Sequence, residues 1–163
     1  MSKSMDAQFL DAFQSAFREG DEKTADKREE AENVRRVEEV FRIIARQDFD
    51  ALGAILADDV TLEIIGSSDI PMAGMTRGRQ MVIEAVRNNF AQLDEQRPEI
   101  HSVVAQGNTV VVIGRDQGLF LPTGRRYDLH CMYQYTFENN KVISIRELFD
   151  TAAMRRATQP END

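Results

Sequence analysis

The stretch NTVVVIGRDQGLFLPTGRRYDLHCMYQYTFENNKVISIRELF, residues 108–149, decides the fold, because β-branched and aromatic residues alternate with polar ones and turn-forming residues interrupt the pattern. Together with the segment before it, this pattern predicts four strands, at 99–106, 109–120, 126–137 and 141–149. They are joined by connections typical of β-hairpins, GN at 107–108, PTGR at 122–125 and ENN at 138–140. The C-terminal half is therefore expected to form an antiparallel meander.

Two carboxylates interrupt the apolar faces of these strands. Alternate side chains of a strand point to opposite sides, so Asp116 shares a face with Val110 and Val112. In the last strand Glu147 shares a face with the apolar residues Ile143, Ile145 and Phe149, and it is the second interrupting carboxylate. A buried carboxylate without partners costs about 2–5 kcal/mol. Both carboxylates therefore need partners or a function.

The strand between these two carries phenols on its apolar face, which is made of Tyr127, Leu129, Cys131, Tyr133, Tyr135 and Phe137. If the three faces form one core, Asp116, Glu147, Tyr133 and Tyr135 converge on one cavity. Two carboxyls in such a cavity tend to titrate apart, one as a base and one as an acid. The alternative is internal ion pairs, with Arg115, Arg125 or Arg126 for Asp116 and with Arg79 or Arg146 for Glu147.

Helical periodicity predicts three helices before the meander. The first carries the apolar stripe Val34, Val37, Val40, Phe41 and Ile44. A second follows a break within residues 46–59, and a third spans 79–93, with a strand at 60–66 and a loop at 67–79 between them. Helices on one face of a curved, mostly antiparallel sheet make an α+β domain. The cavity between the two layers is a default site for a small molecule.

The predicted domain covers residues 34–157 and is followed by a polar tail at 158–163. Residues 1–33 precede it as an amphipathic helix and a charged linker. The helix has a stripe of apolar residues at a spacing of four, Met5, Phe9, Phe13 and Phe17. We expect this stripe to pack on its own domain or on a partner subunit.

Composition limits the partners. The chain has 163 residues, a formal net charge of −8 and no basic stripe, which argues against nucleic acid. Its apolar runs are shorter than the roughly 20 residues of a membrane-spanning helix, and no signal peptide is recognisable. Cys131 is the only cysteine, which fits a reducing cytoplasm, and the two histidines, His101 and His130, show no metal-ligand spacing. We therefore expect no metal site.

Three segments resemble a known clan. LPTGRRYDLHCMYQYTFENNKVISIRELFDTAAM, residues 121–154, resembles the C-terminal half of the limonene-1,2-epoxide hydrolase group. DFDALGAILADDVTLE at 48–63 and RGRQMVIEAV at 77–86 resemble the wider SnoaL-like, ketosteroid isomerase-like clan. The resemblance covers roughly residues 34–155. It implies a cone-shaped NTF2-like (cystatin-like) fold, with three helices packed on the sheet and an N-terminal helical extension.

The resemblance also implies roles for particular residues. In these epoxide hydrolases two Asp residues bridged by an Arg act with a water that a Tyr and an Asn hold. The base-type Asp corresponds to Asp116 through LPTG, and the acid-type Asp corresponds to Glu147 through IRELFD. The bridging Arg corresponds to Gly114, and the Tyr and Asn correspond to Leu62 and Ile64. Arg77 or Arg79 is then the candidate substitute for the bridging arginine.

The pattern of the ketosteroid isomerases does not transfer, because its general base corresponds to Ile64 and its oxyanion-binding Tyr to Val40. The expected function is binding of a small apolar molecule, with acid/base chemistry of the epoxide hydrolase, isomerase or cyclase type and no cofactor. Asp116 and Glu147 are the expected catalytic pair, and Tyr133 is the expected hydrogen-bond donor. The expected ligand-binding residues are Leu62, Ile64, Phe90, Val112, Leu129, Cys131, Tyr135, Ile145 and Phe149.

An alternative function is a non-catalytic ligand-binding or dimeric assembly module, in which the carboxylates form internal salt bridges. The clan resemblance implies a homodimer that pairs through the outer face of the sheet. On that face Val111, Ile113 and Met132 have no helix to cover them.

Overall fold

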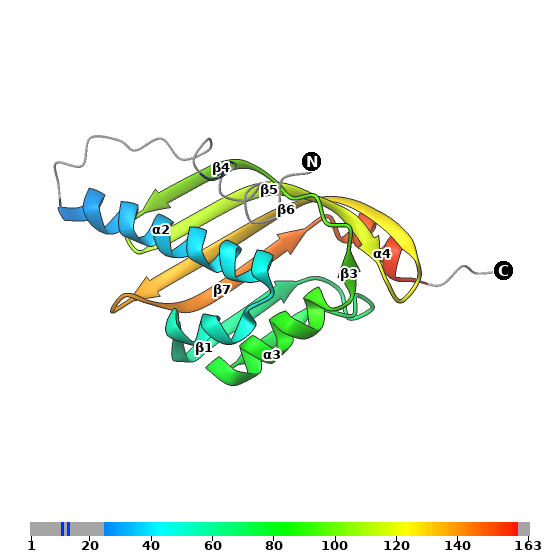
Figure 1. Cartoon of the computed structure of the whole chain (residues 1–163), viewed down its shortest axis with the longest axis horizontal. Helices are drawn as coiled ribbons and strands as arrows, with labels where there is room; N and C mark the ends of the chain where they lie inside the picture. Colours follow the sequence, from blue (N-terminus) through cyan, green and yellow to red (C-terminus); the bar gives the residue numbers. More distant parts are fainter. Residues whose placement is uncertain (1–10, 12, 14–24, 160–163) are drawn as a thin grey trace.

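The computed structural model describes residues 11, 13 and 25–159. Its helical elements are α2 (Ala25–Arg46), the 3-10 helix η1 (Phe49–Ala54), α3 (Arg79–Phe90) and α4 (Thr151–Thr158). Its strands are β1 (Leu56–Ile65), β2 (Gly74–Arg77), β3 (Leu93–Asp94), β4 (Glu99–Gln106), β5 (Thr109–Phe120), β6 (Arg125–Glu138) and β7 (Lys141–Phe149). The element order confirms the α+β class (Figure 1).

The strands form one curved sheet in the order β2-β1-β7-β6-β5-β3, and β4 also pairs with β5. All pairs are antiparallel except β1 with β7. The predicted meander is confirmed, since β4, β5 and β7 have the expected bounds and β6 is one residue longer at each end. Gly107, Gly124, Asn139 and Asn140 adopt positive φ in its turns, as short hairpin connections require.

Helices cover one face of this sheet. Helix α2 packs on β4 and β5, α3 packs on β1, and α4 closes the end of the sheet against β6 (Figure 1). The buried core lies between these helices and the sheet and includes Val37, Val60, Val82, Val110 and Val112. None of the described helices is long and apolar enough to cross a membrane.

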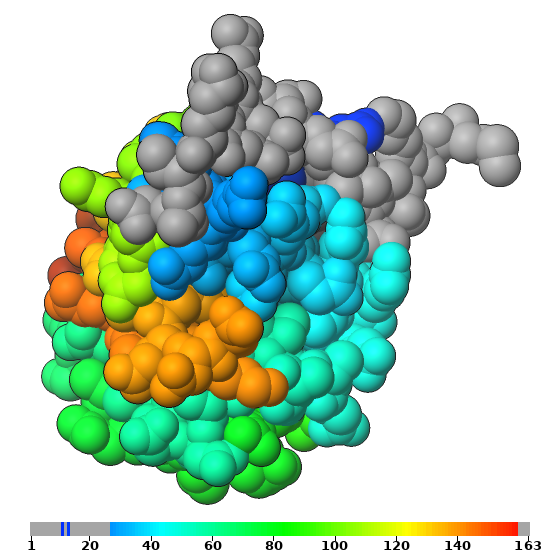
Figure 2. Space-filling view, turned by 90° about the vertical axis from the view of Figure 1, so that its left-hand side faces the viewer, coloured from blue at the N-terminus to red at the C-terminus, as the bar shows by residue number. Residues whose placement is uncertain are grey.

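The expected second helix is wrong, because only one 3-10 segment forms before β1 begins at Leu56. Gly53 lies within this segment, and a glycine costs about 1 kcal/mol in an α-helix relative to alanine. The sheet also recruits the chain here, since the N–H of Val142 donates to the carbonyl of Ile55 and Leu56 pairs with Val142. Figure 2 shows the β6–β7 turn against this segment, where Lys141 Nζ donates to the carbonyl of Ala54.

Pairing with neighbouring strands explains the other differences from the prediction. Residues 74–77 of the predicted loop form β2 against β1. Helix α3 ends at Phe90 because Leu93 pairs with Phe120 as β3. In β7 the register shifts next to Val142, so Val142 rather than Ile143 is fully buried.

The N-terminal stripe is described at one position. Phe13 is 2% exposed, and its ring packs edge-on against Phe41 of α2 with 5.1 Å between the ring centroids. Met5, Phe9 and Phe17 lie outside the described residues. At Phe13, therefore, the N-terminal segment packs on its own domain.

Candidate active site

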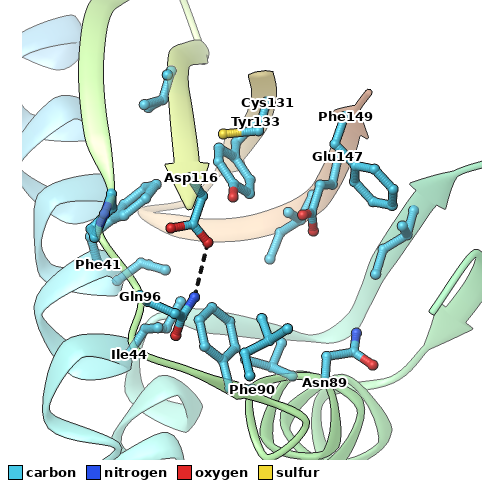
Figure 3. Close-up of a pocket in the computed structure, with 18 of the residues that line it drawn as sticks. Phe41, Ile44, Asn89, Phe90, Gln96, Asp116, Cys131, Tyr133, Glu147 and Phe149 are labelled. Atoms are coloured by element: carbon cyan, nitrogen blue, oxygen red, sulfur yellow. Dashed lines mark hydrogen bonds between the residues drawn. The ribbon is translucent and has the colours of Figure 1, made fainter. Parts of the chain in front are cut away.

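Two carboxyl side chains enter one cavity from different strands. Asp116 projects from β5 and Glu147 from β7, and Tyr133 of β6 lies between them (Figure 3). The sheet register places Tyr133 directly opposite Glu147, whereas Asp116 lies opposite Leu129. Four residues of β6, about 13 Å of strand, separate those two positions. The carboxyls therefore flank the cavity, and no hydrogen bond joins them among the described residues.

One oxygen of Asp116 is held by two donors. Oδ2 accepts hydrogen bonds from Nε2 of Gln96 at 3.0 Å and from the hydroxyl of Tyr127 at 2.9 Å. Oδ1 is buried and has no partner within the described part of the chain. Burial raises the pKa of Asp116 above its usual value, and the hydrogen bonds from Gln96 and Tyr127, followed by the nearby backbone N–H groups of Gln117 and Arg97, oppose that rise. The carboxylate is thus fixed in position, and Oδ1 is its buried oxygen without a partner among the residues that the structure describes.

A glycine makes the bond from Tyr127 possible. Tyr127 lies opposite Gly118 in the β5–β6 register, two residues from the pair that contains Asp116. A Cβ atom at position 118 would lie 2.5 Å from the Tyr127 hydroxyl oxygen. The missing side chain of Gly118 lets the phenol lie across β5 and reach Asp116.

Glu147 has the opposite environment. Its carboxyl forms no hydrogen bond or ion pair with any described residue. Burial, followed by the negative charge of Asp116, raises the pKa of Glu147 to about 7. Part of its surface stays accessible because it faces the cavity. Around neutral pH, therefore, Glu147 is protonated in about half of the molecules.

Two phenols and a thiol lie beside the carboxyls. Burial, followed by the charge of Glu147, raises the pKa values of Tyr133 and Tyr135, so both phenols stay protonated and can donate hydrogen bonds. The Tyr133 ring packs edge-on against Phe41, with centroids 5.5 Å apart. Burial also raises the pKa of Cys131 to about 12, which leaves its thiol unreactive.

The remaining wall is mostly apolar, although Asn89, Gln96, Glu99 and Arg115 also line it, and the cavity volume is about 110 Å³. The nine residues expected to bind a ligand all line this cavity: Leu62, Ile64, Phe90, Val112, Leu129, Cys131, Tyr135, Ile145 and Phe149. Their role in binding stays a prediction. Met72, Met154 and Phe41 line it as well.

The arginines that were candidate partners of the carboxyls point elsewhere. Within the described residues neither carboxyl forms an ion pair with an arginine. Four of the arginines pair with other carboxylates: Arg115 with Asp128, Arg126 with Glu95, Arg146 with Glu63 and Arg79 with Asp58. The guanidinium of Arg125 donates to the carbonyl of Arg156. The predicted internal salt bridges of Asp116 and Glu147 are therefore not formed.

The positions that correspond to the water-binding apparatus of the epoxide hydrolases are apolar or closed. Leu62 and Ile64 are buried side chains of the cavity wall, 4% and 5% exposed. A Cβ atom at Gly114 would lie 2.3 Å from the carbonyl oxygen of Glu99, so β4 leaves no room for a side chain there. Arg79, a candidate substitute for the bridging arginine, donates to the carbonyl of Leu56 at the surface.

Sequence reasoning missed both donors to Asp116. The alternation of side chains in β6 predicts that Tyr127 points inward. The register of the β5–β6 hairpin adds that Tyr127 lies diagonally across from Asp116, within reach of its carboxylate. Gln96 lies in the segment between β3 and β4, where no sequence periodicity predicts the direction in which a side chain points. No cluster of three potential metal-ligating side chains occurs among the residues that the structure describes.

Comparisons with known proteins agree with this architecture. The model of the SnoaL-like domain family matches residues 37–145. An NTF2-like protein from Burkholderia xenovorans is 31% identical, with a TM-score of 0.69, and the match covers 79% of this chain and 97% of that one. A comparison with curated proteins found no match.

Two more distant structures share the fold. A putative SnoaL-like polyketide cyclase from Jannaschia sp. CCS1 is 18% identical with a TM-score of 0.72, and the match covers 86% of this chain and all of that one. An LEH-like epoxide hydrolase from M. tuberculosis is 22% identical with a TM-score of 0.63, and the match covers 79% and 90%. At these identities the likeness shows the NTF2-like fold alone.

Proposed function

Because the chain belongs to the SnoaL-like domain family, we propose that it binds a small, neutral, mostly apolar molecule between Asp116 and Glu147 and transfers protons on it. In this proposal Asp116 is the general base and Glu147 the general acid. Tyr133 donates a hydrogen bond to the oxygen of the ligand that gains charge. The apolar wall supports a neutral ligand, since a charged one would lose its hydration there.

The unpartnered Oδ1 of Asp116 carries the proposal. Buried carboxylate oxygens normally have hydrogen-bond partners, and an orphaned one calls for an explanation. The two donors on Oδ2 keep Asp116 in place and favour its ionised form, so Oδ1 is a positioned base. A proton on a bound ligand would supply the missing partner.

Glu147 provides the complementary group. A carboxyl with a pKa of about 7 is protonated in a large fraction of molecules at neutral pH. General acids work best when their pKa lies near the working pH. In this proposal the carboxyl with hydrogen-bond donors acts as the base and the carboxyl without them as the acid, a division of roles seen in other paired-carboxyl sites.

The reaction class that fits is proton transfer next to a carbonyl. Asp116 Oδ1 takes a proton from the carbon between the carbonyl and the C=C bond of an unsaturated ketone; the C–H electron pair forms a new C=C bond, and the C=O π pair moves to the carbonyl oxygen. Glu147 protonates this oxygen, with Tyr133 as a second donor, to give the conjugated dienol. Return of the proton from Asp116 to the γ-carbon, with the O–H proton going back to Glu147, shifts the C=C bond into conjugation without net consumption of any reagent.

Attack by water is less well supported. Leu62 and Ile64 offer no hydrogen bond at the positions where the related hydrolases hold a water, and Gly114 offers no guanidinium. A water without positioning groups loses much of the catalytic advantage. Isomerase or cyclase chemistry therefore fits this cavity better than epoxide hydrolysis.

Binding without turnover is the second candidate. It is favoured by Gln96 and Tyr127, because both donors that hold Asp116 come from the protein and give the carboxylate a structural role. In that case the cavity would hold the same small neutral ligand, and no proton would be transferred.

The test uses two panels of small molecules. Unsaturated ketones are incubated with the protein in D₂O, and deuterium uptake is followed by mass spectrometry. Epoxides are incubated with the protein in ¹⁸O-labelled water, and formation of labelled diol is followed in the same way. We expect deuterium in the ketones and a loss of about 10²–10⁴-fold in Asp116→Asn. Asp128→Asn, which alters a carboxylate on the outer face of the sheet, is the matched control. Saturable binding with neither deuterium uptake nor diol would favour the second candidate, and diol alone would favour hydrolysis.

A further inference from the structure

A groove lies on the outer side of the cavity wall. Its volume is about 480 Å³, and its polar lining residues are Gln47, Arg87 and Asp94. Phe90 and Leu93 line both this groove and the cavity, so these two side chains form the wall between them. On the groove side Phe90 faces Phe49, with ring centroids 6.0 Å apart, and Figure 3 shows Phe90 directed into the cavity from α3.

The cavity alone accepts only a very small molecule. Its volume of about 110 Å³ is of the same order as the roughly 150 Å³ cavity that holds one benzene in an engineered protein, so it accommodates about one ring. A longer ligand therefore has to continue beyond the wall. Phe90 and Leu93 are both only partly buried, and a change of the Phe90 rotamer would connect the two spaces.

The groove offers both hydrogen-bond donors and acceptors, and Asp94 leaves it with a single unbalanced negative charge. Arg87 Nη2 binds Asp50 Oδ1 at 2.6 Å, and Asp94 Oδ1 accepts the backbone N–H of Glu95 at 2.7 Å. The guanidinium is thus balanced by a carboxylate, and Asp94 adds a second one. With a net charge of −8 on the chain, an anionic tail would gain little here. A neutral group that donates and accepts, such as a hydroxyl or an amide, matches these walls.

We propose that the natural ligand is an elongated neutral amphiphile, whose apolar head lies in the cavity and whose hydroxyl- or amide-bearing tail lies in the groove, with Phe90 as the gate between them. This inference rests on the proposed ligand-binding role of the cavity and specifies the class of ligand. It makes Phe90 and the groove determinants of specificity.

Three probes distinguish binding in the cavity from binding in the groove. Benzene has only the ring that would lie in the cavity. n-Butylbenzene adds an apolar tail for the groove, and 4-phenylbutan-1-ol adds a tail that ends in a hydroxyl. Dissociation constants would be measured by isothermal titration calorimetry with the full chain. We expect 4-phenylbutan-1-ol to bind threefold to tenfold tighter than n-butylbenzene, the worth of about one hydrogen bond.

Ala91→Trp supplies the decisive variant, because Ala91 is exposed and lines the groove but not the cavity. The indole would fill the groove. We expect binding of 4-phenylbutan-1-ol to weaken at least tenfold, while binding of benzene changes less than twofold. Gln80→Trp, at an exposed position of α3, the helix that Ala91 caps, is the control and should change neither constant.

The outcomes distinguish the two proposals. If benzene binds but Ala91→Trp leaves 4-phenylbutan-1-ol unaffected, or if n-butylbenzene binds as tightly as the alcohol, the amphiphile proposal is overturned and the cavity remains a ligand site. If benzene itself does not bind to the wild type, the proposed function of the cavity fails, and the amphiphile proposal fails with it.

Discussion

Asp116 and Glu147 lie in one apolar cavity, and their neighbours give them different chemistry. Asp116 has two hydrogen-bond donors and Glu147 has none. Burial acts on both, but only Asp116 receives contacts that favour the charged form. The difference between the two carboxyls comes from Gln96 and Tyr127 rather than from the acidic residues themselves.

Glu147 is expected to make the folding stability depend on pH. Its pKa is about 7 in the folded chain against an ordinary value of 4.5, so the folded state binds more protons than the unfolded state between these values. Its contribution to the free energy of unfolding therefore falls as pH rises through this window, by about 3 kcal/mol in total. Urea denaturation at pH 5 and pH 8 should show this fall in the wild type and not in Glu147→Gln. Equal pH dependence of the two proteins would contradict the buried, unpartnered state of Glu147.

Tyr127 is expected to act as a positioning residue through Asp116. In Tyr127→Phe the ring stays while the bond to Oδ2 is lost, so the pKa of Asp116 should rise further. The acidic limb of the pH profile of deuterium exchange would then move to higher pH, and the rate at its plateau would fall about tenfold. A purely structural role would reduce the rate at every pH and leave the limb unmoved.

Among the elements, the β5–β6 hairpin was predictable down to the direction of its side chains. The period of two places Asp116 and all six residues of the β6 row inward, and the bounds of β5 follow from its turns. Gln96 was not predictable, because it lies outside the strands and its direction depends on tertiary packing. The row in β7 was predicted correctly at Glu147 and wrongly at Ile143, since a register shift cannot be read from alternation alone.

Strands β4 and β5 approach each other so closely at Gly114 that a side chain at this position should destabilise the sheet. In Gly114→Ala the Cβ would meet the carbonyl oxygen of Glu99 at 2.3 Å, so β4 has to move. We expect a loss of about 1–3 kcal/mol in the free energy of unfolding. Gly53→Ala is the matched control, because its nearest neighbour, a methyl group of Ile83, lies at 3.8 Å. If both variants unfold at the same urea concentration, the account of Gly114 is wrong.

For the whole molecule, we propose a homodimer that pairs through the outer face of the sheet. Val104, Met132 and Leu148 are large apolar residues exposed there, by 53%, 39% and 42%. Such residues on neighbouring strands favour association. Light scattering should show a dimer at micromolar concentration for the wild type and a monomer for Met132→Glu. Met75→Glu, which changes a methionine on β2 that is even more exposed, by 51%, should remain dimeric. A monomeric wild type would exclude this assembly.

The central claim is that the two carboxyls in the cavity titrate apart, with Asp116 losing its proton before Glu147. The most direct measurement is an NMR titration of the side-chain carboxyl carbons, with Asp116→Asn and Glu147→Gln used to assign the two signals. We expect Glu147 to titrate with a midpoint near 7 and Asp116 at a lower pH, above its ordinary value of 3.8. A Glu147 midpoint near 4.5, or an Asp116 that is still protonated when Glu147 has ionised, would contradict the assignment of acid and base.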